Sequence, residues 1–340
     1  MSEPLLVATG LTRHFRIGGV LSGKTLHAVD DVDLTIGRGE IVALVGESGS
    51  GKSTVARLLA RVYRPTRGRI VFDGKRIDRL RTRRERLRYA SDVPLVFQDP
   101  FSSINPAYRV SHGVKRAIKL HRPELSRVER RVEAERVFEA VGLVPPAAML
   151  RKFPHQLSGG QRQRVGFAQA LAFRPKLIVA DEPVSMLDVS IRIGILNLMT
   201  ELRASRGVSF LYITHDIASA RYVADRVLVM YGGHLVEEGA TEDVLHRPKH
   251  PYTKLLLAAV PDPRAPLGLA DVEDAGEPPR VVEPHEGCRF APRCPLATEV
   301  CRTVTPLRRS LGPGRLVACH HAEPDVGEQP SEQPLVGSPA

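Results

Sequence analysis

A nine-residue segment near the start of the chain has the residue types and spacing that bind phosphate. The segment GESGSGKST, residues 46–54, matches the pattern G-x-x-x-x-G-K-[ST]. The apolar run Ile41–Val45 before it indicates a buried strand, and TVARLLARVY after it indicates a helix, which is the context that this pattern requires. Glycines let backbone N–H groups converge on a phosphate, and the helix points its positive end at the same anion. The residues expected to bind a nucleotide here are Gly46, Glu47, Ser48, Gly49, Ser50, Gly51, Lys52, Ser53 and Thr54.

Two acids at the end of a second apolar run supply groups that nucleotide hydrolysis requires. In KLIVADEP, Asp181 and Glu182 follow the strand-like residues 177–180. Lys52 is expected to reach the β- and γ-phosphate oxygens, and the Ser53 hydroxyl to ligate Mg²⁺. Asp181 suits the Mg²⁺ side, directly or through water, while Glu182 would be the base that polarises the attacking water. Two acids at a strand end can also cap a helix, but the phosphate loop in the same chain favours catalysis.

A second anion-binding helix start lies in HQLSGGQRQRVGFAQAL, which begins at His155. The residues of this segment that are expected to contact nucleotide are Ser158, Gly159, Gly160 and Gln161. A helix preceded by a serine and two glycines presents free backbone N–H groups to an anion. Because the chain already has a phosphate loop of its own, the simplest interpretation is that this second site serves a nucleotide held by a different subunit.

These segments together resemble the ATP-binding subunits of ABC transporters. The resemblance rests on six motifs in the family order: the Walker A loop at 46–54, Gln98 in VFQDP, LSGGQ at 157–161, Walker B at 177–182, SMLD at 185–188, and His215 in YITHD. The match covers roughly residues 5–262. It implies ATP and Mg²⁺ as the ligands and ATP hydrolysis coupled to translocation as the activity.

The resemblance assigns roles to four further residues. Gln98 would sense Mg²⁺ and water and link the site to a membrane subunit. His215 would contact the γ-phosphate, so Gln98, Glu182 and His215 form the expected catalytic set. Asp188 would cross the interface between two ATPase subunits. Phe15, in LTRHF, would stack on the adenine ring.

The implied fold is an α/β P-loop NTPase with a RecA-like parallel sheet flanked by helices. An antiparallel β subdomain is expected at the start and a helical subdomain at about residues 100–165. Phosphate-contacting groups in such a fold lie at the carboxyl ends of the strands. Two subunits of the family pack head to tail, and each ATP lies between one Walker A loop and the LSGGQ segment of the other subunit.

Three stretches narrow the resemblance to importers of dipeptides, oligopeptides and nickel: residues 97–106, 181–191 and 246–261. The last stretch, HRPKHPYTKLLLAAVP, lies beyond the catalytic core and is expected to have no role in ATP chemistry. The sequence DEPVS looks more like the second ATPase of such systems. The implied partners are a paralogous ATPase, two membrane permeases and an extracytoplasmic solute-binding protein. The chain would lie at the cytoplasmic face of the membrane; a nickel or other small-solute importer is the alternative.

All four cysteines of the chain lie near its end: Cys288, Cys294, Cys301 and Cys319. Four thiols in a small module of a cytosolic protein favour a metal site over disulfides. Their intervals are wider than the paired spacings usual for zinc. GCRFAPRCP and VACHH resemble the C-terminal module of the same importers, where four cysteines are linked to a [4Fe–4S] cluster. A cluster, a zinc ion and no metal remain open.

The organisation expected from these features has four parts. Residues 1–262 form the ATP-binding domain, and the proline-rich, acidic residues 263–286 form a linker. Residues 287–323 form the cysteine module, and 324–340 are expected to be a disordered tail.

Composition bounds the alternatives. The net charge is +11, and the densest basic stretch, Arg79–Arg88, indicates a solvated helix face more than a specific anion site. Aromatic residues are 5% of the chain and tryptophan is absent, so single-stranded nucleic acid is not an expected partner. No apolar run reaches the roughly 18 residues of a membrane span, and the first residues do not form a secretory signal.

Rival functional classes are each disfavoured by one feature of the sequence. Soluble ABC ATPases of DNA repair or translation usually join two ATPase halves, whereas this chain has one Walker A motif. A binding protein that no longer hydrolyses ATP would not need all of Lys52, Gln98 and Glu182. Exporter ATPases are often fused to membrane segments, and the cysteine module points to import.

Overall fold

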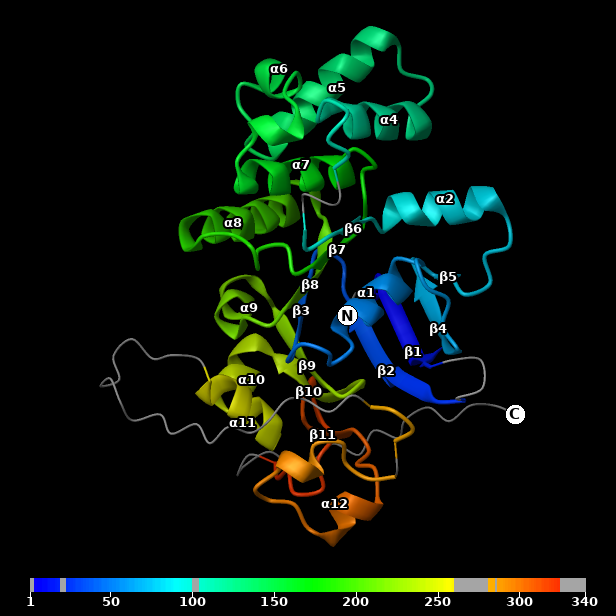
Figure 1. Ribbon diagram of the computed structural model, residues 1–340, viewed down its shortest axis with the longest axis vertical. Helices are drawn as coiled ribbons and strands as arrows, with labels where there is room; N and C mark the ends of the chain where they lie inside the picture. The colour runs from blue at the N-terminus through cyan, green and yellow to red at the C-terminus, as the bar shows by residue number, and fades with distance from the viewer. Residues whose placement is uncertain (1–2, 19–22, 100–103, 260–280, 285, 325–340) are drawn as a thin grey trace.

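The computed structural model describes residues 3–18, 23–99, 104–259, 281–284 and 286–324. Figure 1 shows a layer of helices at the top, two sheets in the middle and residues 286–324 at the bottom. None of the helices in these ranges is long and apolar enough to cross a lipid bilayer.

The central sheet has eight strands in the order β11-β12-β10-β9-β3-β8-β7-β6. Its parallel strands are β3 (Ile41–Val45), β6 (Leu95–Val96), β7 (Leu177–Asp181), β8 (Ser209–Thr214) and β9 (Arg226–Tyr231). Every residue of β3, β7 and β8 is buried, as expected for parallel strands covered on both faces. The expected RecA-like core is confirmed.

The register of the sheet brings three strand ends together. Val45 of β3 pairs with Thr214 of β8, and Ile213 of β8 pairs with Asp181 of β7. The segments that follow β3, β7 and β8 therefore leave the sheet at the same edge. These segments are the phosphate loop, the residues after Asp181, and His215.

A second sheet has the order β2-β1-β4-β5 and is antiparallel throughout. Its strands are β1 (Leu6–Arg16), β2 (Thr25–Ile36), β4 (Arg67–Phe72) and β5 (Lys75–Arg76). Apolar residues of this sheet share one core with α1 (Lys52–Leu59) and with one face of the central sheet. An antiparallel sheet is therefore built from the N-terminal residues, where the sequence places the β subdomain.

The helical layer contains α4 (Ser111–His121), α5 (Arg127–Ala140), α6 (Pro146–Met149), the 3₁₀ turn η1 (Pro154–Gln156) and α7 (Gly159–Leu171). Ser126 and Glu129 form a reciprocal capping box that begins α5, and Val137 and Phe138 bury its inner face. Helices α2 (Arg83–Asp92) and α8 (Val189–Arg206) lie below this layer (Figure 1). The helices begin inside the range expected for the helical subdomain, and α7 continues beyond it.

The remaining elements are α9 (Ile217–Val223), β10 (His234–Ala240), α10 (Thr241–His246), α11 (Pro251–Ala258), η2 (Ala291–Arg293), α12 (Glu299–Thr303), β11 (Arg309–Gly312) and β12 (Arg315–Val317). Strand β12 pairs antiparallel with β10, so the segment between Cys301 and Cys319 extends the central sheet. Arg315 of β12 forms a fully buried ion pair with Glu237 of β10 at 3.1 Å. Most of the expected linker (263–280) and tail (325–340) lie outside the described residues.

Candidate nucleotide-binding site

The two motif glycines of the phosphate loop lie against neighbouring backbone. Gly46 has φ +154° and Gly51 has φ +108°. A Cβ on Gly46 would come closer than 3.0 Å to the carbonyl oxygen of Met230, and a Cβ on Gly51 would do the same to that of Ala28. Both positions therefore require glycine for steric reasons as well as for conformation. The backbone N–H of Gly233 donates to the Ser50 carbonyl at 2.9 Å and holds the loop from a second side.

Lys52 is almost completely buried within the loop that precedes it. Its Nζ donates to the carbonyl oxygens of Gly46 and Glu47, both at 2.7 Å. Burial lowers the pKa of Lys52, while the nearby carboxylates of Glu182 and Asp181 oppose that shift. The ammonium group therefore lies between the loop and the acids that end β7, where a bound triphosphate would meet it.

Ser53 and Asp181, separated by 128 positions, form a pair of oxygen ligands. The Ser53 hydroxyl donates to Asp181 Oδ1 at 2.9 Å. Burial raises the pKa of Asp181, with the charge of Glu182 adding to the effect and the Ser53 hydrogen bond opposing it. A carboxylate and a hydroxyl are hard oxygen donors of the kind that Mg²⁺ prefers, so these residues fit the ion.

Glu182 is the meeting point of three separate motifs. Its Oε2 accepts a hydrogen bond from Gln98 Nε2 at 3.0 Å and lies 3.2 Å from His215 Nδ1. Glu182 has φ +47°, a conformation that costs energy for a residue with a side chain. Its backbone N–H donates to the Ile213 carbonyl at 2.9 Å, and Ser185 Oγ donates to its carbonyl at 3.1 Å. These bonds hold the carboxylate at the edge of the sheet where β7 and β8 end.

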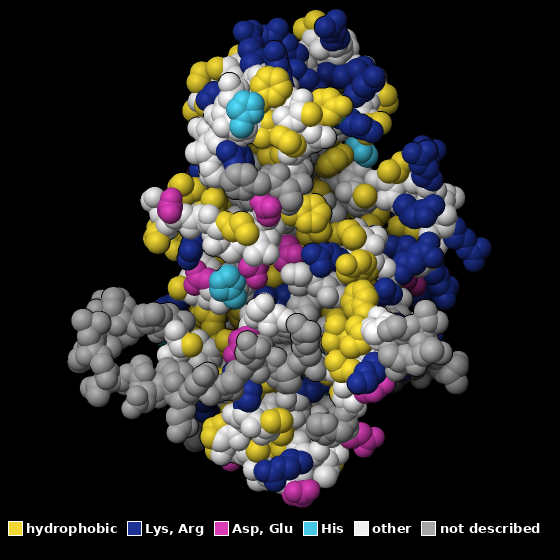
Figure 2. All heavy atoms as spheres, viewed as in Figure 1, with side chains coloured by type: hydrophobic (Ala, Val, Ile, Leu, Met, Phe, Trp, Pro, Cys, Tyr) yellow, Lys and Arg dark blue, Asp and Glu magenta, His cyan; other side chains and the backbone are white. Residues whose placement is uncertain are grey.

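Acidic and basic side chains occupy different parts of the molecular face drawn in Figure 2. Figure 2 shows acidic side chains across the middle of the face, whereas basic side chains cover the top and the right. The charges of Asp181 and Glu182 act on Lys52. A divalent cation bound to a triphosphate would place its positive charge beside these carboxylates and the negative phosphates beside Lys52, so the charges would alternate.

The LSGGQ segment begins α7 and packs on α8. Ser158 Oγ accepts from the Gln161 backbone N–H at 3.3 Å, and Gln161 Oε1 accepts from the Ser158 N–H at 3.2 Å. A Cβ on Gly160 would come closer than 3.0 Å to Ile191 of α8, and one on Gly159 would contact Leu187. The start of α7 therefore packs against Leu187 and the first turn of α8. It is a separate helix start from the one that follows the phosphate loop.

Asp188 begins α8 without capping it through its side chain. Three apolar side chains near it are exposed, Met186 at 61%, Val189 at 69% and Ile193 at 45%. An aspartate among exposed apolar residues is suited to contact with another subunit.

Phe15 lies half-buried on β1. Its ring meets Tyr63 edge-on at 5.4 Å between centroids, and the Arg13 guanidinium lies 4.6 Å from its centroid. His14, its neighbour on the strand, stacks on His27 instead, and both imidazoles contact the Asp30 carboxylate. Stacking of Phe15 on adenine stays a prediction.

Sequence reasoning missed two residues that touch the phosphate loop. The Glu47 backbone N–H donates to the Tyr252 hydroxyl at 2.8 Å, and Arg293 forms two bonds with the Glu47 carboxylate at 2.8 and 3.1 Å. Tyr252 belongs to HPYTKLLLAAVP, which was expected to have no role in ATP chemistry, yet its hydroxyl contacts the backbone of the phosphate loop. The capping histidine and Pro251 predict a helix start there, but no local pattern predicts the contact with Glu47.

The four cysteines are free thiols. Burial raises the pKa of Cys288 and of Cys294, and the charges of Cys301 and Cys319 raise both further. Cys301 Sγ also lies 3.4 Å from His321 Nε2. The sulfurs are not gathered as tightly as ligands of a single ion: within the described ranges, the group whose ligand atoms lie within 4.8 Å of one another is His14, His27 and Asp30. A single zinc ion would hold sulfurs about 3.8 Å apart.

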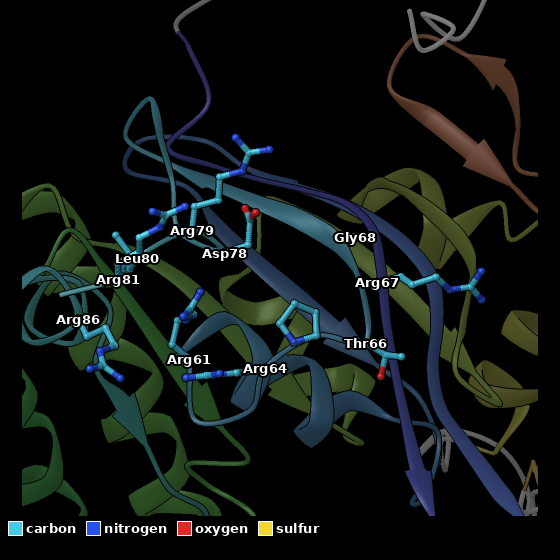
Figure 3. Close-up of a pocket in the computed structure, with 11 residues that line it drawn as sticks. Arg61, Arg64, Thr66, Arg67, Gly68, Asp78, Arg79, Leu80, Arg81 and Arg86 are labelled. Atoms are coloured by element: carbon cyan, nitrogen blue, oxygen red, sulfur yellow. The ribbon is translucent and has the colours of Figure 1, made fainter. Parts of the chain in front are cut away.

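The basic stretch Arg79–Arg88 lies partly on a helix face and partly on a cavity. Helix α2 is largely exposed, in agreement with the favoured interpretation. A cavity of about 900 Å³ nevertheless lies between α2 and the second sheet, lined by Arg61, Arg64, Arg67, Arg79, Arg81, Arg86, Asp78 and four further residues. Figure 3 shows Asp78 between Arg79 on one side and Arg61, Arg64 and Arg86 on the other. This cavity shares no lining residue with the Glu182 site.

The fold and this site together define a P-loop ATPase of the ABC type. The ABC transporter family model matches residues 29–185, and the model described as the oligopeptide/dipeptide transporter C-terminal region matches residues 236–301. The second match contains Tyr252 and three of the four cysteines.

Curated relatives match the chain over nearly its whole length. A putative peptide import ATP-binding protein of Brucella ovis is 40% identical over 316 residues, 93% of this chain and 97% of the relative. The dipeptide transport ATP-binding protein DppF of Haemophilus influenzae is 39% identical over 324 residues, 95% of this chain and 98% of the relative. The chain therefore belongs to the family of ATP-binding subunits of ABC transporters.

Solved structures with the same fold are ATP-binding cassettes. The dimeric cassette MJ0796 bound to ADP and phosphate has a TM-score of 0.62 and 30% identity, covering 69% of this chain and 98% of that one. The structure of cbiO1 from Clostridium perfringens, part of the transporter complex cbiONQ, has a TM-score of 0.61 and 28% identity, covering 72% and 92%.

Proposed function

We propose that this chain hydrolyses ATP to power the import of dipeptides or oligopeptides through a membrane ABC transporter. The observation that carries the proposal is the convergence of Gln98 and His215 on Glu182, in a chain whose C-terminal region matches the oligopeptide/dipeptide family. The relatives named for peptide import favour peptides over nickel or another small solute, which remains the alternative cargo.

Different residues of the site would bind the metal ion, bind the phosphates and activate the attacking water. Mg²⁺ supplies charge that neutralises the phosphate oxygens, and Ser53 and Asp181 would hold it, with Gln98 beside it. Lys52 and the loop N–H groups would bind the β- and γ-phosphates. Glu182 would accept a proton from the attacking water, and His215 would orient that water and contact the γ-phosphate.

We infer that the chain works as a dimer with a paralogous ATPase beneath two permease subunits, with an extracytoplasmic solute-binding protein delivering the cargo. The support is geometric: Ser158, Gly159, Gly160 and Gln161 form a second anion-binding helix start that packs on α8. The exposed Met186 and Val189 flank Asp188 on the adjoining surface. Placement as the second ATPase of such a pair rests on the sequence DEPVS.

We propose further that Cys288, Cys294, Cys301 and Cys319 hold a [4Fe–4S] cluster, with zinc as the alternative. The four free thiols interact electrostatically yet stand wider apart than ligands of one ion. A cluster, which carries its irons on four separate thiolates, tolerates wider sulfur spacing than a single ion does. Anaerobic purification should give a protein with a broad absorbance shoulder at about 400 nm and about four irons per chain. A colourless protein that contains one zinc would contradict the cluster.

The transport function is tested with the assembled complex in liposomes. The chain is co-expressed with the two permeases and the second ATPase, and the solute-binding protein is added outside with or without a peptide. ATP hydrolysis should rise when peptide-loaded binding protein is present, and labelled peptide should accumulate inside. Stimulation by a nickel chelate with no response to peptides would favour the alternative cargo.

A further inference from the structure

We propose that Arg293 and Tyr252, both outside the ATPase motifs, are positioning residues for the phosphate loop and act through Glu47. The inference rests on the proposed ATP binding at that loop and adds a route by which the C-terminal region sets nucleotide affinity. The two residues belong to the matched oligopeptide/dipeptide C-terminal region, so a cassette without this region would lack both contacts.

The first contact is a forked ion pair. Arg293 Nη1 lies 2.8 Å from Glu47 Oε2, and Arg293 Nη2 lies 3.1 Å from Glu47 Oε1. The side chains are 11% and 24% exposed, so water screens the pair only partly. Two parallel N–H···O bonds fix direction as well as distance, which a lysine cannot do. The Arg293 guanidinium also lies 5.7 Å from the Tyr231 ring centroid, which restricts its own movement.

The second contact holds the backbone of the same residue. The Glu47 N–H donates to the Tyr252 hydroxyl at 2.8 Å, and Tyr252 is fully buried. Its ring packs against Tyr231 at 4.5 Å and Phe290 at 5.5 Å between centroids. Phe290 lies between Cys288 and Cys294, so one aromatic cluster joins the cysteine-bearing segment to the phosphate loop.

Glu47 is consequently held at three points. Tyr252 holds its N–H, Arg293 holds its carboxylate, and Lys52 Nζ donates to its carbonyl oxygen at 2.7 Å. The last contact joins Glu47 directly to the lysine that would bind the triphosphate. A shift of the Glu47 peptide would therefore move both the loop N–H groups and Lys52, and phosphate binding depends on their geometry.

A second arginine anchors the other end of the same segment. Arg289 follows Cys288, donates to the Gly232 carbonyl and pairs with Asp30 at 2.7 Å. Gly233, the next residue, holds the Ser50 carbonyl of the loop. The stretch between Cys288 and Cys294 thus contacts the surroundings of the phosphate loop through both arginines. Because coupling between two sites is reciprocal, a loop occupied by nucleotide should stabilise this stretch in return.

The test compares MgATP and MgADP affinity in the full-length protein by isothermal titration calorimetry. Arg293→Gln should raise the dissociation constant by about tenfold, since it removes two charge-assisted bonds. Arg293→Lys should give an intermediate value, and Tyr252→Phe should raise it by about threefold to tenfold. Arg302→Gln is the matched control, because Arg302 is 63% exposed in the same region and pairs only loosely, at 3.7 Å, with Glu299.

Two further readouts separate positioning from general damage. In the ATPase assay of the assembled complex, KM should rise with kcat changed less than about threefold, the pattern expected when binding geometry is lost. Hydrogen–deuterium exchange of residues 286–294 should slow on addition of MgATP in the wild type and remain unchanged in Arg293→Gln.

The outcomes are distinguishable. If Arg293→Gln does not fold, the isosteric Tyr252→Phe decides the question. Wild-type dissociation constants in Tyr252→Phe and in every folded Arg293 variant would overturn the inference while leaving ATP hydrolysis and transport intact. A wild-type protein that binds no nucleotide would instead overturn the proposed function.

Discussion

The Nδ1 atom of His215 lies 3.2 Å from Oε2 of Glu182, across the edge where β8 and β7 end. His215 is 56% exposed and Glu182 is 14% exposed, so the pair has one side open to a ligand and one side fixed by the sheet. The same carboxylate oxygen accepts the Gln98 amide. A carboxylate held by two other side chains and open on one side fits the proposed role of Glu182 as the base.

Replacing this histidine should reduce chemistry more than binding. We predict that His215→Ala lowers kcat for ATP hydrolysis by about 100-fold, the usual scale for losing one hydrogen-bond donor to charge that develops in the transition state. The dissociation constant for MgATP should change by less than about threefold, since Lys52 and the loop remain. Phosphate release and calorimetry measure the two quantities, with the exposed His112→Ala as control. Equal losses in both would mean that His215 only supports the fold.

The Ser53 hydroxyl should set the magnesium requirement. Ser53→Ala removes the hydrogen bond to Asp181 and the hydroxyl proposed to bind Mg²⁺. We expect the Mg²⁺ concentration for half-maximal ATPase activity to rise at least about tenfold, as is common when a metal site loses a ligand or its support. Ser205→Ala, an exposed serine on α8, serves as the matched control. An unchanged Mg²⁺ titration would remove Ser53 from the site.

Two of the three glycines of α7, Gly160 and Gly166, should respond differently to alanine. Gly160→Ala places a Cβ against Ile191, whereas the nearest atom to a Cβ on Gly166 is Val96 Cγ1 at 3.9 Å. Gly160→Ala should destabilise the protein by about 1–3 kcal/mol, the usual cost of overpacking. Gly166→Ala should be neutral or stabilising by up to about 1 kcal/mol through helix propensity. Chemical denaturation measures both, and Ile191→Ala should rescue Gly160→Ala.

Acidification should weaken the fold through His250. Burial lowers the pKa of His250 to about 4, below its ordinary value of 6.5. Its Nδ1 accepts a hydrogen bond from the Tyr252 backbone N–H at 3.0 Å, and its ring lies near Phe290. The Glu237 carboxylate accepts a hydrogen bond from the backbone N–H of His250. The unfolded chain therefore takes up a proton first as the pH falls, so the stabilisation is complete above about pH 6.5 and is lost towards pH 4.

The size of this effect can be measured by substitution. From pH 7 to pH 5, His250 should account for about 2 kcal/mol of lost stability. His250→Asn keeps a side chain able to cap α11 but cannot titrate, so it should flatten the pH dependence. Part of the dependence should remain, because burial also lowers the pKa of His234 to about 4. Identical slopes for wild type and His250→Asn in denaturation at the two pH values would contradict the assignment.

The strands that carry chemistry could be predicted from sequence because burial on both faces leaves a local pattern. The run Ile41–Val45 coincides with β3, and Asp181 ends β7 as its position after an apolar run indicates. His215 directly follows β8. In each case an apolar run marks the buried strand, and parallel strands end at one edge of the sheet.

Other relationships left no local pattern. Tyr252 and Arg293 reach Glu47 across 205 and 246 positions, so only the folded chain brings them together. Strands β11 and β12 are too short to show an alternating pattern, and the pairing of β12 with β10 was not anticipated. Cysteine spacing likewise does not determine how far apart the sulfur atoms lie.

The most direct measurement is ATP turnover by Glu182→Gln in the complex assembled with the second ATPase and the permeases. The substitution keeps the size and the hydrogen bond to Gln98 but removes the base. The predicted result is loss of phosphate release. Calorimetry should still detect MgATP binding, and light scattering should show the mass of a complex in which the two ATPases remain associated. Hydrolysis at the wild-type rate would contradict the role of Glu182 and, with it, the mechanism built on this site.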